Sequence, residues 1–449
     1  MTQEILTPET LAEQFGHIRA ALPGADVPWL DSLRADSLGR FADLGWPTAK
    51  TEAWKYTSLK DVQTIPFGLG RSAKTVESVE VVPCLFSDAH VGLRLVFVNG
   101  HFSARLSALN DMPEGVTAAS LAEVLKTDPA LLKDRLGHIG GEAGGPEDKS
   151  GGQPLLALNT AFMNDGFVIV VGKGIVVEDP IEIVFIGGFG GENVVHNVRN
   201  LIVMEENSRA TIVENYVGFP TSAFVHNEGC EVGVAAGATL KHYKLQTEGF
   251  ETTHLNTVHV DVERDATYET FMLSTGARLT RNEKTVRLKG EGAHCAVNGA
   301  FLLRGTQHCD NTTVIEHLVP HTSSREVFKG ALDGESRGVF QGRIVVHKDA
   351  QKTDGHQMCK TLLLSDKAEI DTKPELEIYA DDVKCSHGAT AGQIDEGALF
   401  YLRSRGIPEV AARELLIEAF LGEALEEISD ERVRGLLRGK VGHWLARDV

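Results

Sequence analysis

The chain of 449 residues lacks the motifs that identify the commonest nucleotide-binding proteins. It contains no Gly-x-x-x-x-Gly-Lys-Ser/Thr phosphate loop, so we expect no nucleotide on this chain by that route. The stretch Gly68-Leu-Gly70-Arg-Ser-Ala73 matches a dinucleotide fingerprint as a string. A strand-like run follows it, whereas the fingerprint works by placing a helix N-terminus on pyrophosphate, so we expect no cofactor there.

Long apolar runs, excess positive charge and paired cysteines are also missing. No stretch approaches the ~18 apolar residues that a membrane span needs, and the net charge of −19 argues against binding nucleic acid or anionic membrane. The first residues, Met1-Thr-Gln-Glu-Ile-Leu, have an acid where a signal peptide has basic residues. The six cysteines are scattered without a Cys-x-x-Cys, which is typical of reduced thiols. We therefore expect a cytoplasmic protein.

What the sequence does contain is a repeat of about 28 residues. An alanine in a short tight turn recurs once per repeat, except that the last interval spans two repeats with a weak unit near Ser323. Short apolar stretches flank each turn, and the connections are too short for crossover helices. The repeat predicts a mainly β fold, a right-handed parallel β-helix in which residues one repeat apart lie on neighbouring strands. The five alanines are Ala210, Ala238, Ala266, Ala293 and Ala350.

The pattern divides the chain into three domains. Residues 1–64 are predicted to be helical, with Thr7 capping a helix that begins at Pro8, and to pack a small core of their own. Residues 65–395 form the β-helix core, which includes a glycine-rich loop at 137–153. Residues 396–449 are predicted to be amphipathic helices that cap the open end of the stack.

Within the core we expect three local features. Residues 79–82 and 93–98 are predicted strands, and the second ends at the turn signal Asn99-Gly100. A helix-like piece near 118–135 interrupts the strands.

Acidic side chains near the end of the repeat leave an enzyme as an alternative. A pair of carboxylates ~5–9 Å apart could hydrolyse a glycosidic bond, as a β-solenoid enzyme acting on carbohydrate would require. A solvated face is the simpler explanation in so acidic a protein. The candidates are Asp371, Glu375, Glu377, Asp381 and Asp382.

Cysteines and histidines also gather near the end of the repeat. Cys359 and His387 are one repeat apart, and the spacing of His356 and Cys385 is one position longer, so each pair is predicted to lie on adjacent coils. Thiolate and imidazole are ligands that iron, zinc and iron–sulfur clusters prefer. No complete set of four ligands with standard spacing is present, which favours a site that is transient or completed by a partner.

Several motifs resemble one family closely. Leu376-Glu-Ile-Tyr-Ala-Asp-Asp-Val-Lys-Cys-Ser-His-Gly-Ala-Thr390, continued by Phe400-Tyr-Leu-Arg-Ser-Arg-Gly-Ile407, resembles the SufB/SufD family of the SUF iron–sulfur cluster assembly system. Gly45-Trp-Pro-Thr-Ala-Lys-Thr-Glu-Ala-Trp-Lys-Tyr-Thr57 is similar to that family's N-terminal signature, and Phe340-Gln-Gly342 and Leu362-Leu-Leu-Ser-Asp-Lys367 agree with it. His387-Gly-Ala-Thr390, where SufB usually has His-Glu-Ala-Thr, favours the SufD branch.

The resemblance implies a function that the spacing does not. It implies a non-catalytic scaffold that pairs with SufB through the β-helix and shares a transient iron–sulfur cluster with it, held by His387 and, less certainly, by Cys385. Cys359 and His356 rank behind them. A purely structural brace for SufB, and a homodimer of the isolated chain, stay open.

The resemblance also implies a contact with the ATPase SufC, which carries the ATP while this chain binds no nucleotide. This contact is expected on the C-terminal helices, whose apolar candidates are Leu415, Leu416, Phe420 and Leu421.

Overall fold

The computed structural model describes residues 5–67, 83–86, 92–110, 112–139, 153–189, 195–219 and 222–446. The glycine string at 68–73, the expected strand at 79–82 and all but the ends of the glycine-rich loop at 137–153 lie outside these residues.

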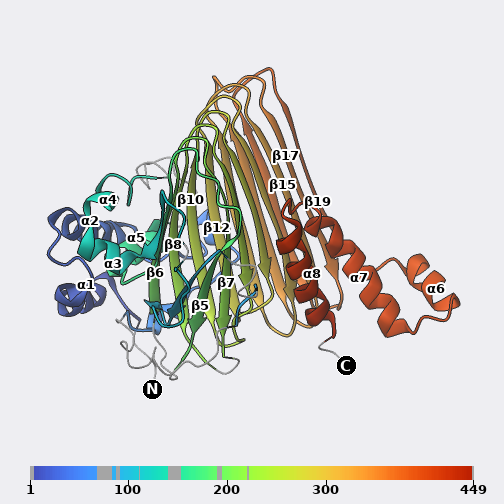
Figure 1. Ribbon diagram of the computed structural model, residues 1–449. Coiled ribbons are helices and arrows are strands. Elements are labelled where there is room, and N and C mark those ends of the chain that lie inside the picture. Colours follow the sequence, from blue (N-terminus) through green and yellow to red (C-terminus); the bar gives the residue numbers. More distant parts are fainter. Residues whose placement is uncertain are drawn as a thin grey trace.

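Two largely parallel sheets form the core, and from β4 onward the chain passes from one sheet to the other with each strand. The pairs β1–β2 and β3–β4 are antiparallel and lie within single sheets. Figure 1 shows the strands stacked as successive coils, which confirms the expected parallel β-solenoid. The ten-stranded sheet contains β1 (Leu93–Val98), β2 (His101–Phe102), β5 (Ile181–Gly187), β7 (Arg209–Gly218), β9 (Thr239–Gln246), β11 (Thr267–Ser274), β13 (His294–Leu303), β15 (Ser323–Leu332), β17 (Asp354–Leu363) and β19 (Lys384–Gly392). The nine-stranded sheet contains β3 (Val116–Ser120), β4 (Phe167–Val171), β6 (Val195–Met204), β8 (Val225–Val234), β10 (Thr253–Val262), β12 (Leu279–Leu288), β14 (His308–His317), β16 (Arg337–Val346) and β18 (Glu369–Ile378).

The turn alanines are equivalent in the middle of the solenoid but not at its ends. Ala238, Ala266 and Ala293 are fully buried and each precedes a strand residue of the same row, as predicted. Ala210 instead lies within β7 and pairs with Leu240 of β9. In the coil of Ala350, the residue that directly precedes the equivalent strand position is Thr353.

The register step between neighbouring coils is not constant, which explains the loss of equivalence. Thr239 of β9 pairs with Thr267 of β11, a step equal to the repeat. Ser323 of β15 pairs with Asp354 of β17, and Asp354 pairs with Lys384 of β19, so both of these later steps are longer. A fixed repeat therefore loses alignment at the longer turns.

The N-terminal helices pack on the nine-stranded sheet, from β6 to β12. Helix α1 (Pro8–Ile18) begins after the Thr7 cap as predicted, and α2 (Pro28–Leu44) ends at Gly45, whose φ of +67° favours glycine. Their core is not separate, because Trp54 and Phe41 share one cluster with Phe162 and with Val225 of β8. The remaining helical elements of this half are η1 (Arg19–Ala21), η2 (Glu52–Trp54), η3 (Val62–Thr64), α3 (Leu121–Thr127), α4 (Ala130–Lys133) and α5 (Gln153–Phe162).

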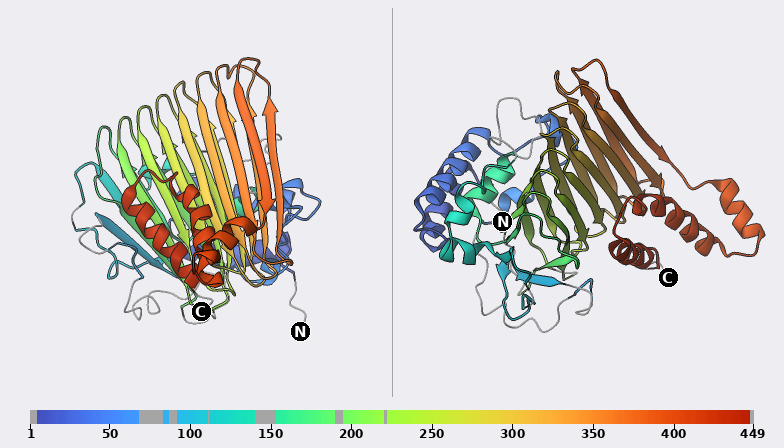
Figure 2. Two further views of the ribbon diagram at one scale, coloured as in Figure 1. Left: turned by 90° about the vertical axis from the view of Figure 1, so that its right-hand side faces the viewer. Right: turned by 45° about the horizontal axis from the view of Figure 1, so that its top comes forward.

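The C-terminal helices lie beside the solenoid and do not cap it. Helices α7 (Glu409–Leu425) and α8 (Glu431–Leu445) cover the outer face of the ten-stranded sheet, and α7 contacts β13 and β15 (Figure 2). Leu421 and Leu437 are buried there in one cluster with Phe271. The prediction of an end cap is therefore wrong. The helices instead bury the apolar outer face of the ten-stranded sheet. Helix α6 (Glu396–Ser404) extends away from the solenoid (Figure 1).

None of the helices in the described part of the chain has the length and apolar content to cross a membrane.

Candidate functional site

The last coil of the solenoid has free strand edges. Strands β18 and β19 stand at the ends of their sheets, and among the described residues no strand pairs with their outer edges. Most side chains of β19 are exposed, whereas β10, in the middle of the stack, is buried throughout. The turn between β18 and β19 adds the exposed Tyr379 to this end. Free backbone donors and acceptors beside exposed apolar groups are typical of a surface that binds another strand.

Cys385 and His387 share one face of this terminal strand. They pair in register with Gly355 and Gln357 of β17, whose side of the strand faces the solenoid interior. Since side chains two positions apart in a strand point the same way, both project into the open end of the solenoid. His387 is exposed, and partial burial raises the pKa of the Cys385 thiol. Imidazole and thiol are thus presented together at an end that a partner could cover.

Cys359 and His387 do lie on adjacent coils, as do His356 and Cys385, but the members of each pair are not register partners. His356 pairs with Ser386, and Cys359 pairs with Ala389, because the register step from β17 to β19 is longer than the repeat on which the prediction was based. Each extra position in a turn shifts the alignment by one, and a shift of one moves a side chain to the opposite face.

Cys359 lies in the core. It is fully buried, and burial raises the pKa of its thiol to about 12, which disfavours the thiolate that a metal needs. Cys309, on β14, is equally buried. His308, beside it, faces outward, where its Nε2 is 3.0 Å from the Thr57 hydroxyl. Both belong to the packing of the solenoid rather than to its open end.

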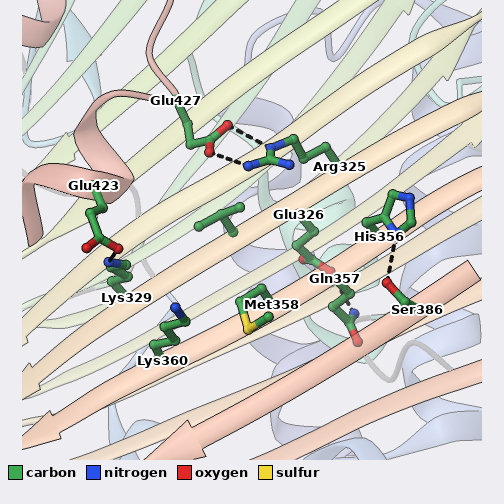
Figure 3. Close-up of a pocket in the computed structure, with 11 residues that line it drawn as sticks. Arg325, Glu326, Lys329, His356, Gln357, Met358, Lys360, Ser386, Glu423 and Glu427 are labelled. Carbon is green, nitrogen blue, oxygen red and sulfur yellow. Dashed lines mark hydrogen bonds and ion pairs between the residues drawn. The ribbon is translucent and has the colours of Figure 1, made fainter. Parts of the chain in front are cut away.

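His356 lies on the outer face of β17, away from the Cys385 and His387 side chains. Its ring is 2.7 Å from the Ser386 hydroxyl and 2.7 Å from Oδ1 of Asp354. It lines a groove of about 380 Å³ between the strands and α7 (Figure 3). Ion pairs cross this groove and hold α7 on the sheet, between Arg325 and Glu427 and between Lys329 and Glu423.

The carboxylates considered for carbohydrate chemistry are mostly neutralised by neighbours. They form ion pairs on β18 and in the following turn, so they lack the free pair that hydrolysis would need. The pairs are Asp371 with Arg337 at 2.6 Å, Glu375 with Lys373 at 3.1 Å, Glu377 with Arg343 at 3.6 Å, and Asp382 with Lys352.

The string Gly334-Glu-Ser336-Arg-Gly338 has the spacing of a hydrolase elbow, but the fold does not support that role. Ser336 is fully buried in a turn that leads into β16, whereas an elbow serine is exposed between a strand and a helix.

The apolar residues predicted to bind a partner divide between two faces of α7. Leu421 is buried against the sheet, and Leu416 and Phe420 pack partly against the same cluster. Leu415 is exposed. A larger exposed apolar group was not predicted: Phe400 and Tyr401 of α6 and Val410 of α7 are 72%, 56% and 60% exposed. Two consecutive aromatic residues in a segment that also carries Glu396 and Arg403 were the available signal.

A buried polar cluster inside the solenoid was also missed. Ligand atoms of Glu214, Glu228 and Cys230 lie within 4.8 Å of one another. The Lys244 ammonium is 3.3 Å from Glu228, and His242 bonds Glu214, so cationic and hydrogen-bonding groups already satisfy the carboxylates. Burial raises the pKa of Glu228 to about 7 and that of Cys230 well above its usual value. These residues therefore fit a charge-balanced core better than a metal site.

The fold and the open end define a class of protein: a parallel β-solenoid with helical flanks and a cysteine–histidine pair on its unpaired last coil. The family model described as "SUF system FeS cluster assembly, SufBD core domain" matches residues 188–420. A second model, "SufBD protein N-terminal region", matches residues 7–183. The chain belongs to the SufB/SufD family of iron–sulfur cluster assembly proteins.

Relatives place the chain nearer to SufD. The iron–sulfur cluster assembly protein SufD of Escherichia coli is 32% identical over 89% of this chain and 90% of its own length. A SufBD family protein of Synechocystis is 30% identical over 94% of this chain and 92% of its own. SufB of Bacillus subtilis is 30% identical, but over only 61% of this chain and 59% of its own length.

Proposed function

We propose that this chain is a non-catalytic cytoplasmic scaffold subunit that holds a nascent iron–sulfur cluster, as cargo, at an interface with a SufB partner. The observation that carries the proposal is the placement of Cys385 and His387 on one face of the unpaired last coil. A partner that covers this end would enclose both side chains and add the ligands that this chain lacks.

The free edges support strand addition as the mode of pairing. An unpaired strand offers a row of backbone N–H and C=O groups, and an incoming strand satisfies them while side-chain contacts give specificity. Among the described residues, β18 and β19 are the last strands of two sheets, so one partner solenoid could continue both.

His387 is the principal ligand in this proposal. An imidazole binds iron through an unprotonated nitrogen, and the ring of His387 is exposed at the open end. Cys385 is a secondary ligand, because its half-buried thiol must lose a proton first. His356 and Cys359 remain behind both, since one lies on the outer face and the other in the core.

The contact with SufC is proposed for the exposed apolar surface of α6 and α7. Phe400, Tyr401, Val410 and Leu415 form this surface, and the remaining apolar residues of α7 are committed at least in part to the solenoid. SufC would then bind the ATP, and the movement of SufC would be transmitted to this chain through α6 and α7.

The test is the variant His387→Ala in the complex co-purified with SufB and SufC. We expect an intact complex with several-fold less bound iron and weaker complementation in cells, and a milder loss for Cys385→Ala. His356→Ala is the matched control, because that ring is exposed on the opposite face of the neighbouring strand. Measuring complex yield and iron on one preparation separates ligation from assembly.

Two other results would overturn the ligand role. A normal iron content in the intact His387→Ala complex would leave this chain as a purely structural brace. A loss of the complex itself would make His387 an interface residue.

A further inference from the structure

A buried glutamine lies directly beneath the proposed ligand. Gln357 is the register partner of His387 on the preceding coil, and the two residues occupy one inward-facing row. Strands in a sheet are about 4.8 Å apart, so the two side chains are stacked neighbours. Gln357 is only 2% exposed although it belongs to the second-last strand of its sheet. The last coil, with His387 above it, provides its cover.

The amide of Gln357 is held in one orientation. Its Nε2 donates a hydrogen bond of 2.7 Å to Oε2 of Glu326, the next residue down the same row (Figure 3). The amide also crosses the interior to β16, where a Cβ on Gly342 would lie 2.0 Å from its Nε2. Gly342 thus leaves the space that the amide occupies, and Glu326 fixes which way the nitrogen points.

This orientation leaves one buried acceptor unused. Among the described residues, Oε1 of Gln357 is buried without a hydrogen-bond partner. Its Nε2 faces the preceding coil, so Oε1, on the other side of the amide, faces the following one. A buried carbonyl oxygen without a donor is destabilising. Its register partner on the following coil, His387, carries a ring N–H.

We infer that Gln357 is a positioning residue that accepts a ring N–H of His387 through Oε1 and so fixes the tautomer and orientation of the imidazole. A rotation of the exposed ring toward the interior makes this bond. The second nitrogen is then unprotonated and directed out of the open end, as an iron ligand requires. The arrangement follows the general pattern in which a ligating histidine donates its other N–H to a neighbouring acceptor. The inference rests on the proposed function for its purpose, but its geometry can be tested without iron.

The direct test observes the imidazole nitrogens of the isolated full-length chain. The protein is labelled with 15N-histidine, and the signals of His387 among the 17 histidines are assigned from their absence in His387→Ala. We expect one dominant neutral tautomer in the wild type. Gln357→Met, which keeps the volume but removes the acceptor, should give a mixture of both tautomers. Gly342→Ala should do the same by displacing the amide.

A swapped pair provides the rescue. Glu326→Gln combined with Gln357→Glu keeps an amide–carboxylate hydrogen bond in the row and presents a carboxylate oxygen to the ring, so one tautomer should persist. Thr361→Val is the control: it removes another buried polar atom on the same inward face of β17, in register with Ala391 rather than His387. It should leave the signals of His387 unchanged.

The wild-type spectrum is decisive even if a variant fails to fold. A mixture of tautomers in the wild type would overturn the inference, and so would a single tautomer that persists in folded Gln357→Met.

The assembled complex separates this inference from the proposed function. In the complex with SufB and SufC, Gln357→Met should weaken iron binding by about tenfold. If the tautomer depends on Gln357 while His387→Ala still loads iron normally, the positioning stands and the ligand role falls. If His387→Ala loses iron while the tautomers are mixed, the ligand role stands and the positioning falls.

Discussion

The stability of this end of the solenoid should depend most strongly on the ionisation of the Glu326 carboxyl group. It is 1% exposed, and burial raises its pKa from 4.5 to about 7. The folded state therefore keeps the proton to higher pH than the unfolded state does. Stability that is present below pH 4.5 is lost as the pH rises through about 7.

We expect Glu326→Gln to remove this dependence. Relative to the variant, the wild type should lose up to about 3 kcal/mol of unfolding free energy between pH 4.5 and pH 7, at 1.36 kcal/mol per pKa unit. Denaturant unfolding of both proteins across this range measures the difference. Glu335→Gln is the control, because the hydrogen bond from Lys367 lowers the pKa of that exposed carboxyl and reverses the direction. A difference that stays constant with pH would contradict the assignment.

At the scale of the residue, the sequence identified the candidate ligands His387 and Cys385 but not the two buried residues beneath His387. His387 and Cys385 were found because a histidine and a cysteine two positions apart in a polar strand resemble a ligand pair and belong to a specific motif. Gln357 and Glu326 carry no such signal, since a glutamine and a glutamate in alternating strands usually face solvent. Only the observed register, which pairs Glu326 with Gln357 and Gln357 with His387, brings them beneath the imidazole.

Local signals predicted single elements more reliably than the relations between them. The Thr7 cap with Pro8 and the Asn99-Gly100 turn depend on a few neighbouring residues, and both occur where expected. The N-terminal signature was assigned to a separate helical core, whereas Trp54 packs on the buried guanidinium of Arg281 at 3.9 Å and so attaches that segment to the solenoid. Contacts between residues so far apart in the chain leave no local pattern.

The surface formed by α6 and the start of α7 gives a prediction at the scale of the element. Phe400→Ser combined with Val410→Ser should weaken the binding of SufC at least about tenfold, because exposed aromatic and aliphatic anchors carry much of the energy of an interface. These side chains are 72% and 60% exposed, so the fold should be unaffected. Titration of SufC against the purified chain measures the affinity.

Phe250→Ser is the matched control for this variant. Phe250 is 47% exposed in a turn between β9 and β10, far along the chain from the C-terminal helices. Deleting residues 409–449 would be a poorer test, since α7 and α8 cover apolar residues of the ten-stranded sheet. Unchanged affinity in the folded double variant would move the SufC contact elsewhere.

At the scale of the whole molecule, different helices cover the outer faces of the two sheets, and the last coil is left open. The N-terminal helices bury apolar side chains of the nine-stranded sheet from β6 to β12, and the C-terminal helices bury those of the ten-stranded sheet. Neither group covers the outer edges of the last coil, whose strands have ten and nine residues, although Lys373 of β18 forms an ion pair with Glu52 of the N-terminal segment. The sequence suggested a cap here because open ends are usually covered. In a subunit of an assembly, the cover can come from another chain.

The direction of the backbone groups on β19 allows a test of whether another chain covers the last coil. The N–H of Lys384 bonds to Thr353 at 2.9 Å, and N–H groups alternate along a strand, so the N–H of Ala389 points to the free edge. Ala389→Pro removes that donor and places a ring where a neighbouring strand would approach, without removing a bond to β17. We expect association with SufB to weaken at least about tenfold, and any homodimer built on this edge to dissociate. Ala389→Val keeps the N–H and should associate normally. Sedimentation of each variant, alone and with SufB, measures both equilibria, and wild-type association of a folded Ala389→Pro would mean that partners attach to another surface.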